Sequence, residues 1–445
     1  MDFATQKIYI LGLGISGIAA ARVLHKLGAD LYLYDDQKAQ EQLPGDLANL
    51  NYCHYVDLDW QQFDYLLISP GIPTSLPEPH PAVLLARQHQ VKITIDIELF
   101  AYLIPKAKLI AITGTNGKST TASLIHHLLK ESGLVAYLGG NIGVPVFDLP
   151  QEDSADSYYV LELSSFQLEL IERLAFDYAI WLNLTADHLD RHGDMQGYKQ
   201  AKLNIFKNAA LKAEAQKIIG IDDQYSKQVF NSEVGAKTSF SKDQQEADYY
   251  FTDNILHAKQ EKFALQVNPA LFGNKQNIIA AAIIKDQLGL TNEQFYIALQ
   301  SFVPLKHRMQ FLGQKNKVNF FNDSKATNAE STLNALKQLD DIFLILGGIA
   351  KEGGIEILLP ELAKVKFIAL IGESQQLFKT QLEQANYHNY ILCADLAEAV
   401  NQSFALAQQE NLELNLLFSP AAASFDMWQN FVARGNDFIN IYEKI

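Results

Sequence analysis

Residues 107–131 read AKLIAITGTNGKSTTASLIHHLLKE, and this stretch decides how the middle of the chain folds. The apolar run Lys108–Thr113 predicts a buried strand, and Ser119–Glu131 has the spacing of a helix. Between them lies a loop rich in Gly, Ser and Thr. Backbone amides at such a strand–loop–helix junction can cradle phosphate oxygens, so the stretch predicts a nucleotide site in an α/β domain.

The loop itself indicates which side chains would contact a nucleotide. Lys118 is expected to reach the β- and γ-phosphates, and Ser119 to offer its hydroxyl to Mg²⁺. The full Walker pattern is not met, because its first glycine position is Ile112. The alternative is a Gly/Ser turn that binds nothing. The expected phosphate loop comprises Gly114, Thr115, Asn116, Gly117, Lys118, Ser119 and Thr120.

The first hundred residues predict a second α/β unit, with a strand, a helix and a strand in series. Gly12–Gly17 reads GLGISG, which matches the dinucleotide-binding fingerprint, and Asp35 lies where an acid would take a ribose hydroxyl. Close packing of helix on strand also produces such glycines, and a uridine nucleotide could use the same cradle. The loop Ser69–Pro73 follows the predicted strand Asp64–Ile68, at the end where open sheets bind ligands.

The last part of the chain predicts a third α/β unit with a parallel sheet, because strand-like and helix-length segments alternate. Residues 213–260 are polar and weakly periodic, and we expect some antiparallel strands there. The prediction is a three-domain α/β protein, with boundaries at 1–98, 99–304 and 305–445. The strand-like segments of the third unit are 318–323, 341–348, 365–372 and 415–420.

Composition narrows the class of protein. The 445 residues are 48% hydrophobic and 20% charged, which is typical of soluble globular domains. A net charge of −15 disfavours nucleic-acid binding, and two cysteines far apart in sequence fit a reducing cytoplasm. The apolar run Ile8–Ala21 could pass for a signal-peptide core, but its glycines argue against export. No apolar run is long enough to predict a membrane span.

Further side chains suggest a metal or phosphate site. Glu162 ends a predicted buried strand and suits Mg²⁺, although a strand-end acid is often merely solvated. The segment NLTADHLDRHG could bind a metal or phosphate, or it could be only a solvated polar loop. Lys202 lies on a predicted helix further along the chain and could be only a surface charge. The polar residues of that loop are Asp187, His188, Asp190 and His192.

The third unit has donor-rich segments at predicted strand ends. Lys306-His307-Arg308 follows a linker, and Asn322–Asn328 leaves a strand. Gly347-Gly348 and Ser419-Pro420 end further strands. These segments could bind ligand, or their Asp and Ser side chains could cap helices.

Together these motifs resemble the Mur ligase superfamily, which carries a GTNGK-type loop in a central ATPase domain between two α/β domains. The similarity covers essentially the whole chain. The GLGxSG, SPGIP, ELSSFQLE, DHLDRHG and SPAAASFD segments look most like the members that add D-glutamate to UDP-N-acetylmuramoyl-L-alanine. The resemblance implies a Rossmann-like UDP-binding domain, a central ATP-binding domain and a C-terminal domain for the amino acid.

The resemblance also implies a reaction of peptidoglycan precursor synthesis, and hence a role in cell-wall formation and cell division. ATP phosphorylates the substrate carboxylate, and the amino group attacks the acyl phosphate through a tetrahedral intermediate. Two Mg²⁺ ions are implied, held by Ser119, Glu162, His188 and a carbamylated Lys202. The implied catalytic residues are Lys118, Glu162, His188 and Lys202.

The resemblance assigns the remaining contacts by position. The uridine diphosphate is implied to contact Gly14, Ile15, Ser16, Ser69, Pro70, Gly71 and Ile72, and the muramoyl part Asn141 and Ser164. The implied ATP contacts are Asn274 and Asn277 at adenine, Arg308 at the γ-phosphate, Asp323 at the ribose and Lys325 nearby. D-Glutamate is implied to contact Thr327, Lys351, Ser424 and Phe431. Asp36-Gln37 and Gly273 depart from the familiar pattern, so uracil and adenine contacts should differ there.

Other functions stay open at the level of sequence. The nearest is another amide ligase of the superfamily, such as a folylpolyglutamate synthase, which lacks a Rossmann-like domain before the ATP loop, or a ligase that adds alanine or a diamino acid. A nucleotide sensor or a dinucleotide-dependent oxidoreductase is a more distant alternative. We expect a monomer whose partners are small molecules.

Overall fold

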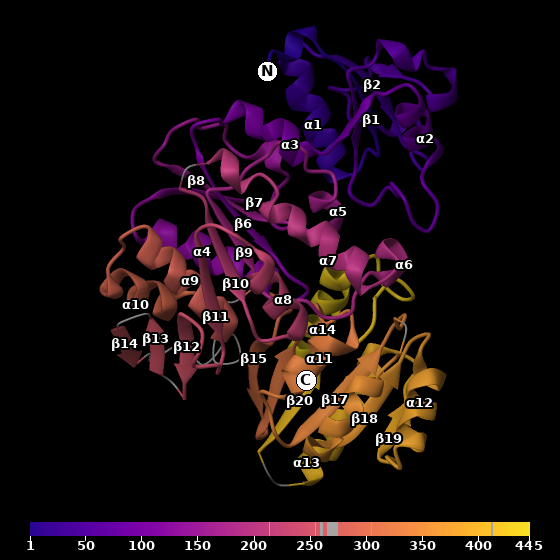
Figure 1. The fold of residues 1–445 in the computed structure, drawn as a ribbon. Coiled ribbons are helices and arrows are strands. Elements are labelled where there is room, and N and C mark those ends of the chain that lie inside the picture. The colour runs from indigo at the N-terminus through magenta and orange to yellow at the C-terminus, as the bar shows by residue number, and fades with distance from the viewer. Residues whose placement is uncertain are drawn as a thin grey trace. The chain divides into compact units, whose positions relative to one another are not determined.

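The computed structural model describes residues 1–212, 214–253, 255–258, 261–264, 275–303, 305–351, 353–410 and 413–445. These residues form two compact units, one up to residue 301 and one from residue 302. The first unit contains two β-sheets and the second contains one (Figure 1). The predicted α/β class with three mostly parallel sheets is confirmed.

The first sheet of the first unit is parallel throughout, with strand order β3-β2-β1-β4-β5. The two loops predicted to bind ligand follow β1 and β4, which are neighbours, so both loops leave the same edge of the sheet. The elements are β1 (Lys7–Leu11), α1 (Ile15–Lys26), β2 (Asp30–Tyr34), β3 (Asn51–Tyr52), β4 (Tyr65–Ile68), α2 (Pro81–Gln88), β5 (Lys92–Thr94) and α3 (Asp96–Phe100).

The second sheet of the first unit has the order β14-β13-β12-β11-β10-β9-β6-β8-β7. It is parallel from β7 through to β12, whereas β13 pairs antiparallel with both β12 and β14, as expected for part of the polar segment. The strands are β6 (Lys108–Thr113), β7 (Val135–Gly140), β8 (Ser157–Glu162), β9 (Tyr178–Trp181), β10 (Gln216–Gly220), β11 (Lys237–Ser241), β12 (Tyr249–Thr252), β13 (Ile255–Ala258) and β14 (Glu261–Ala264).

Helix α4 starts at the predicted phosphate loop and packs against α9 and α10 (Figure 1). Its start lies one residue before the predicted one. The helices of this part are α4 (Lys118–Glu131), α5 (Ser165–Leu168), α6 (Leu189–His192), α7 (Met195–Leu203), α8 (Gln224–Ser232), α9 (Lys275–Gln287) and α10 (Asn292–Ser301).

The second unit is a six-stranded sheet, of order β15-β16-β20-β17-β18-β19, with helices on both faces. The central strand β17 is buried along its whole length, because Leu344 packs toward α11 and α12 while Phe343 packs toward α13. The elements are β15 (Gln310–Lys315), β16 (Val318–Asn322), α11 (Ala329–Leu336), β17 (Ile342–Gly347), β18 (Val365–Ile371), α12 (Gln375–Gln384), β19 (Tyr390–Leu392), α13 (Leu396–Gln409), β20 (Leu414–Phe418) and α14 (Phe431–Lys444).

The four strands predicted for the third sheet, β16, β17, β18 and β20, are parallel as expected, but the sheet also has an edge strand, β15, that was not predicted and runs antiparallel to β16. The two strands are joined by Asn316 and Lys317, which both have positive φ, at 48° and 65°. Two consecutive residues of this kind make the tight hairpin turn that suits the twist of paired strands. Such a short connection permits only antiparallel pairing.

Arg434 on α14 holds the strand-end loops of the second unit together. It is fully buried, and its guanidinium donates to Ser324 O at 2.7 Å, Ser324 Oγ at 3.0 Å and Ala422 O at 3.0 Å. Burial lowers the pKa of Arg434 to about 10. One side chain thereby fixes the loops after β16 and β20.

Among the described residues, no helix is long and apolar enough to cross a membrane.

We predict that Arg434→Met destabilises the second unit by about 3 kcal/mol, because buried carbonyls lose a charged donor. Urea unfolding followed by hydrogen exchange in peptides from residues 305–445 would measure this. Lys444→Met, an exposed change on the same helix, is the control and should have little effect. Equal stability of both variants would contradict the role assigned to Arg434.

Candidate nucleotide and metal site

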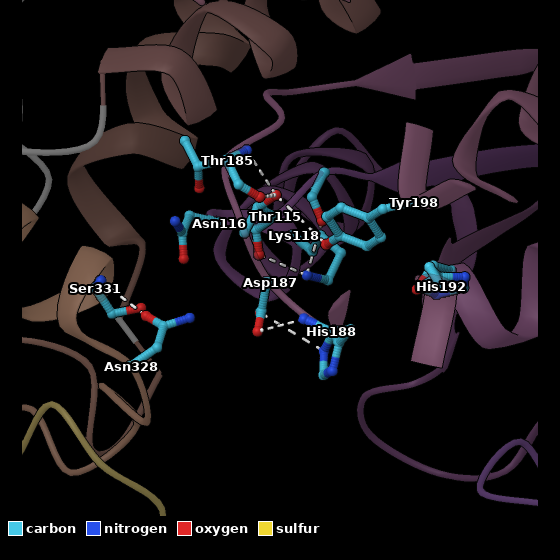
Figure 2. Close-up of polar contacts among 12 residues, drawn as sticks. Thr115, Asn116, Lys118, Thr185, Asp187, His188, His192, Tyr198, Asn328 and Ser331 are labelled. Carbon is cyan, nitrogen blue, oxygen red and sulfur yellow. Dashed lines mark hydrogen bonds and ion pairs between the residues drawn. The ribbon is translucent and has the colours of Figure 1, made fainter. Parts of the chain in front are cut away.

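The predicted phosphate loop joins β6 to α4, and its lysine folds back over it. Lys118 Nζ donates to Gly114 O at 3.0 Å and to Thr115 O at 2.8 Å (Figure 2). Gly117 is the N-cap of α4, with φ 86°, so no side chain covers the helix N-terminus there. A cation beside the open, positive end of a helix suits phosphate oxygens.

Two glycines of this loop are required by close packing. A Cβ on Gly114 would lie 2.9 Å from Leu182 Cβ, and one on Gly117 would lie 2.7 Å from Asn277 Oδ1. Both glycines also have positive φ, at 152° and 86°. Positive φ is common in plain turns as well, but a turn at the surface does not need such close packing, so the packing favours the phosphate-loop interpretation.

Asn183, just after the neighbouring strand β9, supports the loop, and the sequence did not single it out. Its side chain accepts from Asn116 N at 2.9 Å and donates to Asn116 O at 3.1 Å, while its carbonyl accepts from Thr115 N at 3.0 Å. Thr185 N and O both bond to the Thr115 hydroxyl, at 3.0 and 3.1 Å. The feature of the sequence that could have indicated Asn183 is its position in the segment NLT, at the end of a predicted strand.

Lys202 is buried beneath the loop, so its interpretation as a surface charge is wrong. The side chain is 1% exposed, and Nζ donates to Gly114 O at 2.9 Å and to Thr113 Oγ1 at 3.3 Å. Nζ also lies 4.8 Å from the centre of the Tyr198 ring. Burial, and then the charge of Lys118, hold the pKa of Lys202 well below its ordinary value.

Glu162, at the end of β8, is likewise buried, so it is not a solvated strand-end acid. Its Oε1 accepts from Asn141 Nδ2 at 3.2 Å. Its Oε2 is buried and has no hydrogen-bond partner within the described part of the chain. An unsatisfied buried carboxylate oxygen is costly unless something binds it, and oxygen is the donor that Mg²⁺ prefers.

The DHLDRHG segment divides into two groups. Asp187 and His188 lie side by side before α6, with His188 Nε2 3.6 Å from Asp187 Oδ2 (Figure 2). His188 has φ 53°, and its side chain is 41% exposed. His192 points inward instead and bonds to Ser165 Oγ at 2.9 Å, and burial lowers its pKa. Asp190 is exposed.

The side-chain oxygens of Ser119 and Glu162 suit a Mg²⁺ ion whose remaining ligands are phosphate and water oxygens. Among the residues that the structure describes, no three His, Cys, Asp or Glu side chains gather as a metal cage. Ser119 is buried at the start of α4 and Glu162 carries an orphaned oxygen. Mg²⁺ usually binds through one or two protein groups together with phosphate and water, which matches this sparse set.

The two predicted ligand loops of the first sheet touch each other. Ser69 Oγ donates to Gly12 O at 2.9 Å, and a Cβ on Gly12, whose φ is 90°, would lie 2.7 Å from that hydroxyl. Ile15, at the start of α1, is 78% exposed. The Asp35 carboxylate accepts from Leu13 N at 2.6 Å, so it is used to hold the glycine turn.

Most of the other residues predicted to contact substrate or adenine form hydrogen bonds within the protein. Asn141 donates its backbone N–H to Glu162 O at 2.8 Å, which places it beside Glu162. Ser164 caps α5 in a reciprocal pair with Gln167. Asn277 is buried and accepts from Thr121 Oγ1 at 3.0 Å. Asn274 and its neighbour Gly273 lie outside the described residues.

In the second unit, Asp323 is buried behind the end of β16. It accepts from Ser419 Oγ at 2.7 Å and Met309 N at 3.1 Å, and burial raises its pKa to about 7. Lys325 Nζ lies 4.0 Å from the centre of the Phe431 ring. Asn328, and not an Asp or Ser of this segment, caps α11 by accepting from Ser331 N (Figure 2).

The residues implied for D-glutamate leave the same edge of that sheet. Thr327 follows β16, Lys351 follows β17 and Ser424 follows β20, and these three strands are parallel neighbours. A backbone bridge between Ile349 and Ala423 joins the loops of Lys351 and Ser424. Phe431 begins α14 after the same loop.

Comparison with known proteins gives matches along the whole chain. Family models described as the Mur ligase MurD-like N-terminal domain, the Mur ligase middle domain and the Mur ligase glutamate ligase domain match residues 6–94, 112–285 and 307–416. The UDP-N-acetylmuramoylalanine--D-glutamate ligase of Wolbachia sp. subsp. Brugia malayi is 35% identical, over 100% of this chain and 97% of that protein. The chain belongs to the Mur ligase family.

Two further comparisons agree with the family assignment. The protein of the same name from Caulobacter vibrioides is 37% identical, over 98% of this chain and 95% of that protein. The structure of a MurF ligase from Thermotoga maritima in complex with ADP has a TM-score of 0.60 at 16% identity, and covers 100% of this chain and 98% of that one. The second match shows that the fold is shared. As a Mur ligase, the chain is an ATP-dependent enzyme that forms amide bonds.

We predict that Gly117→Ala weakens ATP binding by this Mur ligase about tenfold or more, because the methyl group meets Asn277 and the backbone is strained. Gly133→Ala is a matched control, with a similar φ of 80° but open space around its Cβ. It should lose stability while keeping its ATP affinity. Calorimetric titration with ATP would compare them, and equal affinities would refute the packing argument.

Proposed function

We propose that this enzyme joins D-glutamate to UDP-N-acetylmuramoyl-L-alanine and converts ATP to ADP and phosphate. One observation carries the proposal. Lys118 and Lys202 converge on the Gly114 carbonyl, at a phosphate loop beside the Glu162 oxygen that has no hydrogen-bond partner among the described residues. Relatives that match over the full chain bear the name of this activity. A site of this kind suits transfer of a phosphoryl group to a carboxylate.

The loop residues are proposed to bind ATP, which supplies the phosphate that activates the substrate carboxylate as an acyl phosphate. Lys118 would neutralise charge on the β- and γ-phosphates, and the amides at the start of α4 would orient them. Arg308, Asp323 and Lys325 of the second unit are proposed for the γ-phosphate and ribose. The amino group of D-glutamate would then displace phosphate through a tetrahedral intermediate.

Ser119, Glu162 and His188 are proposed to hold Mg²⁺, with two ions in all. Lys202 would join them as a carbamate. Its lowered pKa favours the neutral amine, and a neutral amine adds to CO₂, forming an N–C bond and releasing a proton. The product would replace a cation with a carboxylate next to the metal ligands.

The remaining contacts are proposed from their positions at strand ends. The uridine diphosphate would lie at the touching loops of Gly14 and Ser69, and D-glutamate at the loops of Lys351 and Ser424. The division at 1–98, 99–304 and 305–445 is proposed to separate these three roles, supported by the three family matches. We also propose that the protein is cytoplasmic and a monomer. The two free cysteines support the first of these, because the cytoplasm keeps thiols reduced.

The test is phosphate release from ATP in the presence of UDP-N-acetylmuramoyl-L-alanine. We expect release with D-glutamate and none with L-glutamate, L-lysine or no amino acid. Release with a different amine alone would reassign the chain to another amide ligase. Release with ATP alone would contradict a ligase.

Lys118→Ala serves as the site control in the same assay. We expect loss of turnover, because the β- and γ-phosphates lose their cation. Lys130→Ala, which removes a lysine from the last turn of the same helix, should keep its activity. Full activity of Lys118→Ala would contradict the site assignment.

The carbamate proposal predicts that Lys202→Ala is inactive and that added short-chain carboxylates restore phosphate release in part. The small side chain leaves room for a carboxylate that replaces the carbamate. A Lys202→Met variant fills that room and should not be rescued. If Lys202→Ala folds but carboxylates restore nothing, the carbamate loses its support.

A further inference from the structure

Four side chains form a polar cluster in the first unit, here called the Glu169 cluster, in which Glu169 is partly buried and the other three are buried: Thr74, Glu169, Arg191 and His192. Glu169 Oε1 accepts from Thr74 Oγ1 at 2.7 Å and from Arg191 Nη2 at 3.2 Å. Glu169 Oε2 lies 3.8 Å from His192 Nδ1. The Arg191 and His192 side chains are 7% and 4% exposed. The predicted DHLDRHG segment therefore contributes two residues that the reaction scheme does not use.

The cluster reaches the loop proposed for the UDP-linked substrate. Arg191 Nη2 also donates to Ile72 O at 2.7 Å, and Ile72 belongs to that loop. Thr74 lies two residues further on and bonds to the same carboxylate as Arg191. The loop is thus held at two points by groups from the segments around α5 and α6.

The cluster also contacts the segment proposed to bind metal. Arg191 is on α6, which begins immediately after His188. The guanidinium carbon lies 5.0 Å from the centre of the Phe166 ring, and the same ring lies 5.0 Å from the His188 ring. Arg191 therefore connects the substrate loop and the surroundings of His188 through direct contacts.

Stability alone does not account for this arrangement. A buried ion pair contributes little net free energy compared with apolar side chains of similar size. In addition, Arg191 Nε is buried and has no hydrogen-bond partner among the residues that the structure describes, which is a further cost. A planar guanidinium does offer fixed direction, because its donors are held in one rigid fork.

We propose that Arg191, held by Glu169, is a positioning residue that fixes the Ser69–Ile72 loop for the UDP-linked substrate. It acts through the Ile72 carbonyl and does not touch the reacting atoms. The inference rests on the proposed function for the identity of that substrate. The contacts that carry it do not depend on that identity.

The test compares ligand affinities and the mobility of the loop. Arg191→Met should weaken binding of UDP-N-acetylmuramoyl-L-alanine about tenfold in calorimetry, through loss of charged hydrogen bonds, while ATP affinity changes less than about twofold. Its KM for that substrate should rise more than its KM for D-glutamate. Without any ligand, hydrogen exchange in residues 69–76 should become faster.

Conservative variants separate positioning from folding. Glu169→Gln keeps an oxygen that accepts from Thr74 and Arg191, so its affinity should lie near that of the native enzyme, whereas Glu169→Ala should resemble Arg191→Met. Thr74→Val removes one hydroxyl and should give a smaller effect in the same direction. Arg87→Met, an exposed change on α2, is the control and should alter nothing.

Two results would overturn the inference. One is unchanged exchange of residues 69–76 in Arg191→Met. The other is a loss of activity that only follows the folded fraction, with substrate affinity intact. If the native enzyme does not bind UDP-N-acetylmuramoyl-L-alanine, the proposed function fails, and the exchange experiment alone decides the role of Arg191.

Discussion

The carbonyl oxygen of Gly114 accepts hydrogen bonds from two lysines, and the chemistry of the candidate site depends on that contact. Lys118 Nζ lies 3.0 Å and Lys202 Nζ 2.9 Å from this oxygen. Two ammonium groups so placed repel each other, and burial of Lys202 leaves little solvent to screen them. The carboxylates of Glu162 and Asp187 offset part of this repulsion, and a nucleotide phosphate beside Lys118 would offset more of it.

Parallel sheet topology brings the other groups to this point. Strands β8 and β9 flank β6; β8 ends at Glu162, and the segment with Asp187 and His188 follows the end of β9. Each strand thus delivers one kind of group to one edge of the sheet. The second unit repeats the arrangement, since Asp323 follows β16 and Lys351 follows β17. The carboxyl ends of the parallel strands in the two sheets present different side chains, and these can serve different parts of one reaction.

The sequence predicted what is local and missed what depends on packing. The phosphate loop was predictable because strand, glycines and helix are contiguous. The burial of Lys202 was not, because it depends on α7 packing against a loop 88 residues earlier in the chain. Arg434 was not singled out either, because its full burial depends on contacts with distant carbonyls. The hairpin of β15 was missed because Asn316-Lys317 contains no glycine, although both residues adopt positive φ.

The glycine fingerprint of the first sheet shows how one pattern serves different ligands. Asp35, which would take a ribose hydroxyl in a dinucleotide site, here accepts from Leu13 N and from the amides of Gln37 and Lys38. The acid therefore stabilises the turn that carries the glycines, and Gly12 is needed because Ser69 packs against it. Both features are internal requirements of the fold. The fingerprint accordingly identifies a tight strand–helix turn, whereas the ligand is decided by what the loops of Gly14 and Ser69 present together.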